Sequence, residues 1–253
     1  MAGPSLTRAL SPRTFLVHGL LAGLVAGFAA FLVAHQLGEP PLDAAIAVEA
    51  AHHHDGAALV SRADQSTWGL ATATLGIGTT LGGLVALAAA AAVGRIGRLR
   101  PSQSTALVVL VGFTAAGLVP FWKYPASPPA VSRADTIGDR TAEYFAFAAI
   151  SVVAAVAATV LAARLLPRVG TYRSVLAGVG GYLAVAVLAG SLMPAVGATG
   201  DVPAQTLWLF RRASLATQAT LWAILGVALV GLVGRTHRTH AERSARRELA
   251  ASL

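Results

Sequence analysis

Six long apolar stretches are the feature that most limits what this chain can fold into. Each is close in length to the ~20 residues that a helix needs to cross the core of a bilayer. They are Phe15–Leu37, Trp68–Val93, Thr105–Trp122, Tyr144–Leu166, Val175–Met193 and Ala213–Val233. Charged residues or prolines bound each stretch, and the third is the shortest. The pattern predicts an all-α fold, a polytopic membrane bundle of about six transmembrane helices.

The composition fits a bilayer better than water. Charged residues make up 12% of the chain and apolar residues 55%, whereas a soluble domain carries about 25% charged residues. Cysteine is absent, which excludes disulfides, thiolate metal sites and a cysteine nucleophile. The basic residues lie between the apolar stretches, so the net charge of +8 indicates membrane topology. We therefore expect a lipid bilayer as the partner, and no nucleic acid.

The first apolar stretch follows two arginines, Arg8 and Arg13, as the apolar part of a signal peptide would. Its apolar run is longer than that of a usual signal peptide. The sequence Leu32-Val33-Ala34 is also a poor match to a small-residue cleavage site. We expect this stretch to be retained as a membrane span.

The charges also predict an orientation. Thirteen of the 19 basic residues lie in alternate connections: residues 1–14, the second-to-third and fourth-to-fifth connections, and the tail 235–253. By the positive-inside rule these segments are cytoplasmic, and so are both termini. Nine of the 11 carboxylates lie on the opposite side. The transmembrane domain is thus expected over 15–234, with extracytoplasmic loops at 38–67, 123–143 and 194–212.

Several motifs on the predicted outer side together resemble one family. They are Phe31–His35 running into Gly38–Asp43, Gln65–Leu70 entering a Gly/Thr-rich helix, the proline-rich Val119–Val131, and Leu207–Arg211. In these stretches the chain resembles the CbtA family, proposed subunits of a bacterial cobalt transporter. The likeness runs over most of the chain, roughly residues 14–234.

The resemblance implies a function. Members are thought to move cobalt for cobalamin synthesis, beside a small, single-span CbtB partner that bears histidines. It implies a multi-pass protein of the bacterial cytoplasmic (inner) membrane that is not an enzyme. Cobalt would be its transported cation, and no tightly bound cofactor is expected. A homo-oligomer stays open.

A histidine run in the first outer loop is the clearest candidate metal site. It consists of His52, His53, His54 and Asp55, with Glu49 just upstream. Imidazole and carboxylate suit Co²⁺, Ni²⁺ and Zn²⁺, and the Irving–Williams order of metal affinities gives no preference for cobalt. Adjacent histidines in a loop cannot all face one ion, so we expect weak capture of a hydrated cation. The plainer interpretation is a solvated polar loop.

A second candidate lies at the outer end of the first span. His35, Glu39 and Asp43 would share one face if the helix continued, because they are four residues apart. Pro40 and Pro41 argue that the helix stops here, since the residue before a proline avoids the helical region. Ordinary polarity at a membrane interface is the alternative.

Two further patterns predict packing. Glycines recur at four-residue spacing in the first span, and more loosely in the second, which favours close helix contacts (Gly19, Gly23 and Gly27; Gly76, Gly78, Gly82 and Gly83). The proline-rich segment Trp122–Val131 is expected to form an ordered outer structure packed on the bundle.

Uptake of a divalent metal is the leading functional interpretation. The chain has no G-x-x-x-x-G-K-[ST] loop, so it does not hydrolyse nucleotide by that route. A non-conducting scaffold or metal-delivery partner is the alternative, favoured by the near absence of charge in mid-span. A membrane enzyme is less favoured, because H-E-x-x-H and G-x-S-x-G are both missing.

Overall fold

A computed structural model describes residues 11–52, 60–128, 137–195 and 202–252. Within these ranges the chain forms helices and no strand, which confirms the all-α class. Five helical segments of this described part of the chain are long and apolar enough to cross a membrane. They are Pro12–Ala50, Arg62–Ala92, Pro101–Lys123, Gly138–Leu192 and Ala204–Ala251. The chain therefore has the composition and helix lengths of a multi-pass membrane protein.

The helices group into two compact units. The first unit comprises residues 1–29, 74–110 and 221–253, and the second comprises 30–73 and 111–220. Several helices contribute residues to both units, so a unit here is a set of packed helix portions.

The first helical segment continues through the two prolines at which the sequence predicts a helix end. Helix α2 (Pro12–Val33) continues through a π-helical turn, η1 (Ala34–Gly38), into α3 (Glu39–His52). The expectation that Pro40 and Pro41 end the helix is therefore wrong. The two prolines are the second and third residues of α3 and directly follow the π turn, a register that differs from the α-helix.

The second segment mirrors the first in containing a π turn. A short helix α4 (Arg62–Asp64) leads through η2 (Gln65–Gly69) into α5 (Leu70–Ala92). In the first unit α5 packs directly on α2. A Cβ added at Gly78 would lie 2.6 Å from the carbonyl oxygen of Gly23, and one at Gly82 would lie 2.7 Å from the Cα of Gly23. The predicted contact through glycines is confirmed, and no larger side chain fits there without a shift.

The third segment is continuous over 23 residues, Pro101–Lys123. It consists of α6 (Pro101–Gly112), the π turn η3 (Phe113–Leu118) and α7 (Val119–Lys123). The shortest predicted span, Thr105–Trp122, lies wholly inside it. At about 1.5 Å per residue, 23 residues reach roughly 34 Å, which is enough for a bilayer core.

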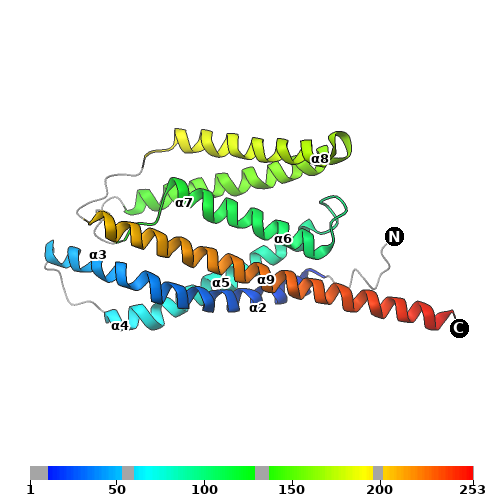
Figure 1. Cartoon of the computed structure of the whole chain (residues 1–253), viewed down its shortest axis with the longest axis horizontal. Coiled ribbons are helices and arrows are strands. Elements are labelled where there is room, and N and C mark those ends of the chain that lie inside the picture. The colour runs from blue at the N-terminus through cyan, green and yellow to red at the C-terminus, as the bar shows by residue number, and fades with distance from the viewer. Residues whose placement is uncertain (1–10, 53–59, 129–136, 196–201, 253) are drawn as a thin grey trace. The chain divides into compact units, whose positions relative to one another are not determined.

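Helix α8 (Ile137–Leu192) is a hairpin (Figure 1). The backbone leaves the helical region at Gly170, where φ is +78° and ψ is 171°, three residues after Pro167. A positive φ of this kind suits glycine, which has no Cβ to clash. The two arms, 137–169 and 171–192, run antiparallel and contain the predicted fourth and fifth spans. The connection predicted between these spans is thus a sharp turn inside helical chain.

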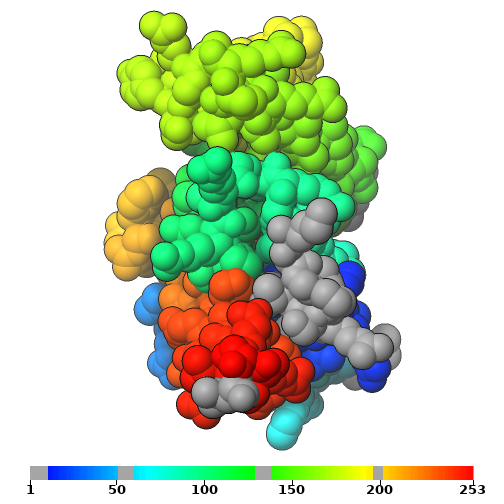
Figure 2. Space-filling model, turned by 90° about the vertical axis from the view of Figure 1, so that its right-hand side faces the viewer, coloured from blue at the N-terminus to red at the C-terminus, as the bar shows by residue number. Residues whose placement is uncertain are grey.

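Helix α9 (Ala204–Ala251) has 48 residues, many more than a bilayer needs. It begins inside the outer loop that was predicted for 194–212 and continues through the predicted basic tail. At ~1.5 Å per residue it would be roughly 72 Å long. Figure 2 views the molecule from the side where α9 ends, and the last turns of this helix (red) face the viewer.

Candidate functional site

An ion-pair triad joins α3 to α4 in the second unit. The Arg62 guanidinium donates through Nε to Asp43 Oδ1 at 2.8 Å and through Nη2 to Glu39 Oε2. Glu39 and Asp43 are four residues apart on α3, which places both carboxylates on one face of that helix. The three side chains differ in exposure: 11% for Glu39, 33% for Arg62 and 59% for Asp43. The triad is therefore open on the Asp43 side and closed on the Glu39 side.

Local hydrogen bonds fix Arg62 at the start of its helix. Ser61 is the N-cap, and its hydroxyl oxygen accepts from the backbone N–H of Asp64 at 3.1 Å. The same hydroxyl donates to Asp64 Oδ2 at 2.6 Å. The Gln65 side chain donates to the Val60 carbonyl oxygen at 3.1 Å. Capping of this kind stabilises the first turn of a helix, which makes few backbone hydrogen bonds of its own.

His35 lies in η1, and its ring is held from two sides. Nδ1 lies 3.0 Å from the carbonyl oxygen of Ser66, which belongs to η2. A carbonyl oxygen only accepts, so Nδ1 carries the proton, and in the neutral ring Nε2 keeps a lone pair. The ring also stacks on Phe31, with centroids 5.7 Å apart and planes at 23°. This is the arrangement in which a histidine is oriented as a ligand.

Both π turns change the backbone hydrogen bonds next to this histidine. In η2 the Leu70 N–H donates to the carbonyls of Gln65 and Thr67, so the Ser66 carbonyl is left to accept from the ring. In η1 the Glu39 N–H donates to Ala34 O, five residues back. Pi turns of this type often occur at functional sites.

The prolines after η1 leave backbone oxygens without helical donors. The carbonyl oxygen of Gln36 would accept from residue 40 in an α register or 41 in a π register, and both are prolines. For His35 the α-register donor, the Glu39 N–H, is already used by Ala34, and the π-register donor would be Pro40. Two successive carbonyls are therefore available to water or a cation.

The described structure does not assemble the predicted metal ligands into one centre. Among residues 11–52, 60–128, 137–195 and 202–252 no group of three or more His, Asp or Glu is placed to hold a metal ion. His52 is the last residue of α3, and its side chain is not described; His53, His54 and Asp55 lie outside the described residues. Glu49 is half-buried on α3. Glu39 is paired with Arg62, and His35 with Ser66.

Arg62 is the residue of this site that sequence reasoning did not assign. The sequence contained a signal for it, because Arg62 is the one basic residue in the acidic outer loop predicted for 38–67. Spacing along the chain could not show which carboxylate it meets. The pairing depends on α3 continuing past Pro40 and Pro41, which the sequence argued against.

The proline-rich segment after α7 is packed over residues 124–128, as predicted, whereas Trp122, in the last turn of α7, is 79% exposed. Tyr124 Oη donates to the Pro194 carbonyl at 3.1 Å, and Arg211 Nε donates to the Ala126 carbonyl at 3.4 Å. Pro128 is fully buried. Burial and then the negative charge of Glu143 raise the pKa of Tyr124 above its usual value, so its hydroxyl stays a donor at neutral pH. Residues 129–131 of the predicted segment lie outside the described residues.

Lys123 belongs to the same packed segment. Its Nζ donates to the Met193 carbonyl oxygen at 3.2 Å and lies 5.4 Å from the centre of the Tyr124 ring. Met193 directly follows the end of α8, so the amine neutralises the negative end of a helix. This position accounts for the lysine by packing and electrostatics, without a metal or substrate.

Comparison with known proteins identifies a matching family. A family model described as a probable cobalt transporter subunit (CbtA) matches residues 12–234, which is most of the chain. No curated protein and no solved structure matches significantly. The match includes the ion-pair triad, His35, both π turns beside it and the packed proline segment.

Proposed function

The chain belongs to the CbtA family of probable cobalt transporter subunits, and we propose that it captures a divalent cation at its outer side and passes it inward, with cobalt as the leading candidate. The family match makes the chain a membrane component of a metal uptake system. The cation is cargo, so no resident cofactor is part of the proposal.

The arrangement of His35 is the observation that carries this proposal. Its ring is oriented by Ser66 and Phe31, and Nε2 keeps a lone pair in the neutral form. Imidazole is a ligand that Co²⁺ accepts well, although Ni²⁺ and Zn²⁺ accept it also. Glu39 and Asp43 follow on the same helix and add negative charge. We take this end of α2 and α3 as the place where a captured ion first meets oriented ligands.

Capture itself is assigned to the histidine run. Glu49 lies on α3, and His52 ends that helix, so the run His52–His54 with Asp55 begins where the continued first span stops. The imidazoles and carboxylates of this run would raise the local concentration of a hydrated dication. The oriented groups nearer the membrane would then receive it.

The topology supports capture from outside. We propose six spans, counting the two arms of α8 separately, with both termini in the cytoplasm of a bacterium and the protein in its inner membrane. The proposal is supported by the 13 of 19 basic residues that lie on the terminal side. The membrane potential would then favour inward movement of a dication by about 4.6 kcal/mol at 100 mV.

A second candidate function is a non-conducting subunit that delivers metal to a partner. It is favoured by the finding that no cluster of three or more His, Asp or Glu forms among the described residues. A small histidine-bearing membrane subunit of the CbtB type would be the partner, and a homo-oligomer is the other assembly to test. Cobalt flux into liposomes containing only this chain separates the two functions: conduction requires flux, and delivery requires none.

Uptake in cells tests the capture step. Cells that lack other cobalt uptake would express the wild type or the triple variant His52→Ala, His53→Ala, His54→Ala. We expect the triple variant to accumulate less ⁵⁷Co at limiting cobalt and to reach nearly the same maximal rate, because capture raises occupancy only. His35→Ala should lower the maximal rate as well. The double variant His237→Ala, His240→Ala on α9 is the matched control. Equal uptake by all variants would show that these histidines take no part in metal uptake.

A further inference from the structure

Arg62 holds the position that an incoming cation would need. Its guanidinium contacts both Glu39 and Asp43, which are the acidic groups next to His35 on the continued helix. We propose that Arg62 is a resident counter-cation that the transported ion must displace, and that it thereby selects doubly charged over singly charged ions. The inference rests on the proposed function and adds a specificity-determining residue to it.

Charge balance gives the reason for selectivity. Two carboxylates and one guanidinium leave the triad with a net charge of −1. A sodium or potassium ion that replaced the guanidinium would restore the same balance and would lose the two directed hydrogen bonds that Arg62 makes. A divalent ion carries twice the charge, so its attraction to the same two carboxylates is twice as large at equal distance. Of the two kinds of ion, the divalent one therefore recovers more of the attraction that is lost when the guanidinium leaves.

The graded exposure of the triad gives the exchange a direction. Asp43 is the most exposed of the three side chains at 59%, and Glu39 is the least exposed at 11%. An ion from water meets Asp43 first and competes there with the 2.8 Å hydrogen bond from Arg62 Nε. Glu39 becomes available only when the guanidinium leaves. Arg62 is itself one-third exposed, so its long side chain can turn into water without unfolding α4.

Backbone oxygens next to the triad support an ion there. The carbonyls of His35 and Gln36 lack helical donors because of Pro40 and Pro41. Backbone carbonyls without helical donors are among the groups with which membrane transporters hold cations. This feature is independent of the acidic pair, and a purely structural ion pair would not require it.

The alternative is that Arg62 only fastens α4 to α3. Both roles predict that loss of Arg62 weakens the structure, so stability alone does not separate them. They differ in what added metal does. In the exchange role Co²⁺ binds at Glu39 and Asp43 even when Arg62 is present, whereas a fastener does not yield the two carboxylates to metal.

Binding to the purified full chain is the test. All variants would carry His52→Ala, His53→Ala and His54→Ala, so that the histidine run does not mask the site. Calorimetry would measure Co²⁺ affinity with and without sodium chloride, and thermal unfolding would measure the cobalt-induced rise in Tm. The matched control adds Glu39→Gln and Asp43→Asn to Arg62→Gln, which removes the carboxylates that the ion would use.

We expect Arg62→Gln to bind Co²⁺ about tenfold more tightly than the parent, the size of one charge-assisted hydrogen bond. Its Tm should rise more with Co²⁺ than that of the parent, and sodium should now compete for the site. The control should lose all three effects. Should Arg62→Gln not be purifiable, Arg62→Lys keeps the charge without the forked geometry and should bind Co²⁺ with intermediate affinity.

A parent whose cobalt affinity and cobalt-induced Tm rise equal those of the control would overturn the exchange role and leave Arg62 as a fastener. So would values that are the same in the parent and both Arg62 variants. That result would not touch the proposed function, which depends on uptake in cells. Conversely, absent cellular uptake with a tightened site in Arg62→Gln would keep the exchange site and reject transport by this chain.

Discussion

Helices α2 and α5 and the two arms of α8 are both pairs rich in glycine and alanine, yet they pack differently. Between α2 and α5 the backbones touch, so that a Cβ at Gly27 would lie 2.5 Å from the Thr74 carbonyl oxygen. Between the arms of α8 the approach is looser: an added Cβ at Gly178 would lie 3.1 Å from the Ala158 carbonyl oxygen, and one at Gly190 would lie 3.8 Å from the Phe147 ring. A Cβ added at Gly180 or Gly181 would meet no atom within 4 Å.

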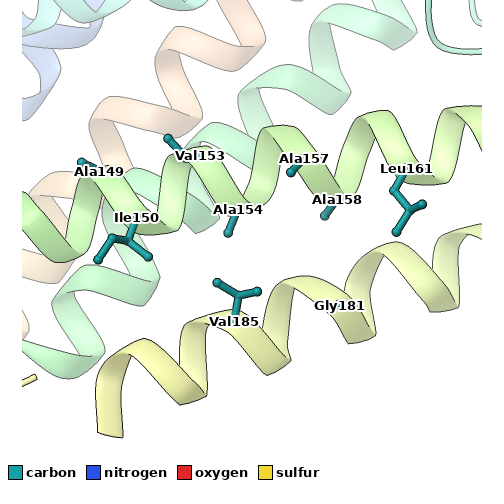
Figure 3. Close-up of a pocket in the computed structure, with 9 residues that line it drawn as sticks. All are labelled: Ala149, Ile150, Val153, Ala154, Ala157, Ala158, Leu161, Gly181 and Val185. Atoms are coloured by element: carbon teal, nitrogen blue, oxygen red, sulfur yellow. The ribbon is translucent and has the colours of Figure 1, made fainter. Parts of the chain in front are cut away.

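The arms of α8 are held by something other than glycine contact. Ser151 and Tyr182, one on each arm, share a buried hydrogen bond of 2.9 Å. Tyr182 packs in a small core with Ala154 and Ala155 of the other arm and Ala115 of η3. Beside this core an apolar groove of about 690 Å³ opens between the arms. Figure 3 shows Ala154 and Ala158 of the first arm facing Val185 and Gly181 of the second.

The difference shows that small residues permit close packing but do not cause it. In α2 three glycines at four-residue spacing form one continuous stripe, and α5 supplies Gly78 and Gly82 opposite to it. Both surfaces are flat, so the backbones meet. In α8 the first arm offers alanines and valines where α2 offers glycines, so the two backbones stay farther apart.

The largest effect is expected from Gly82→Ala on α5. The new Cβ would meet Gly19 and Gly23 of α2, and the atoms in its way are backbone that cannot rotate aside. We expect about 1–3 kcal/mol of destabilisation, the usual cost of overpacking, seen as a lower Tm of the purified protein in detergent. Gly76→Ala on the same helix is the control, because its Cβ meets no atom within 4 Å. Equal melting of the two variants would mean that α2 and α5 are not in backbone contact.

A smaller effect is expected from Tyr182→Phe in the second arm of α8. The change removes one hydroxyl, so that Ser151, only 1% exposed, loses its partner. An unpaired buried hydroxyl of this kind costs about 1–1.5 kcal/mol. Thermal unfolding of the purified protein is again the measurement. Tyr172→Phe in the same arm is the control, since Tyr172 is 80% exposed. A Tm for Tyr182→Phe that matches the control would show that the arms are held by apolar packing alone.

The sequence predicts this fold well wherever the signal lies within one helix. Apolar runs place the spans, and the stripe of Gly19, Gly23 and Gly27 predicts the contact with α5. The candidate site was less predictable, because it depends on how two segments meet. Pro40 and Pro41 signal a helix end, and only the π turn before them lets the helix continue. Without that continuation, nothing in the sequence pairs Arg62 with Glu39 and Asp43.

An effect of the opposite sign is expected from Gly180→Ala with Gly181→Ala. Neither added Cβ meets an atom within 4 Å, so no clash opposes the gain in helix propensity. Alanine is favoured over glycine inside a helix by about 0.5–1 kcal/mol per residue. The double variant should therefore melt slightly above the wild type, whereas Gly82→Ala melts below it. Melting of both variants in the same detergent makes the comparison direct. A lower Tm for Gly180→Ala, Gly181→Ala would mean that the arms of α8 close on each other in the folded protein, so that its two glycine-bearing regions pack alike.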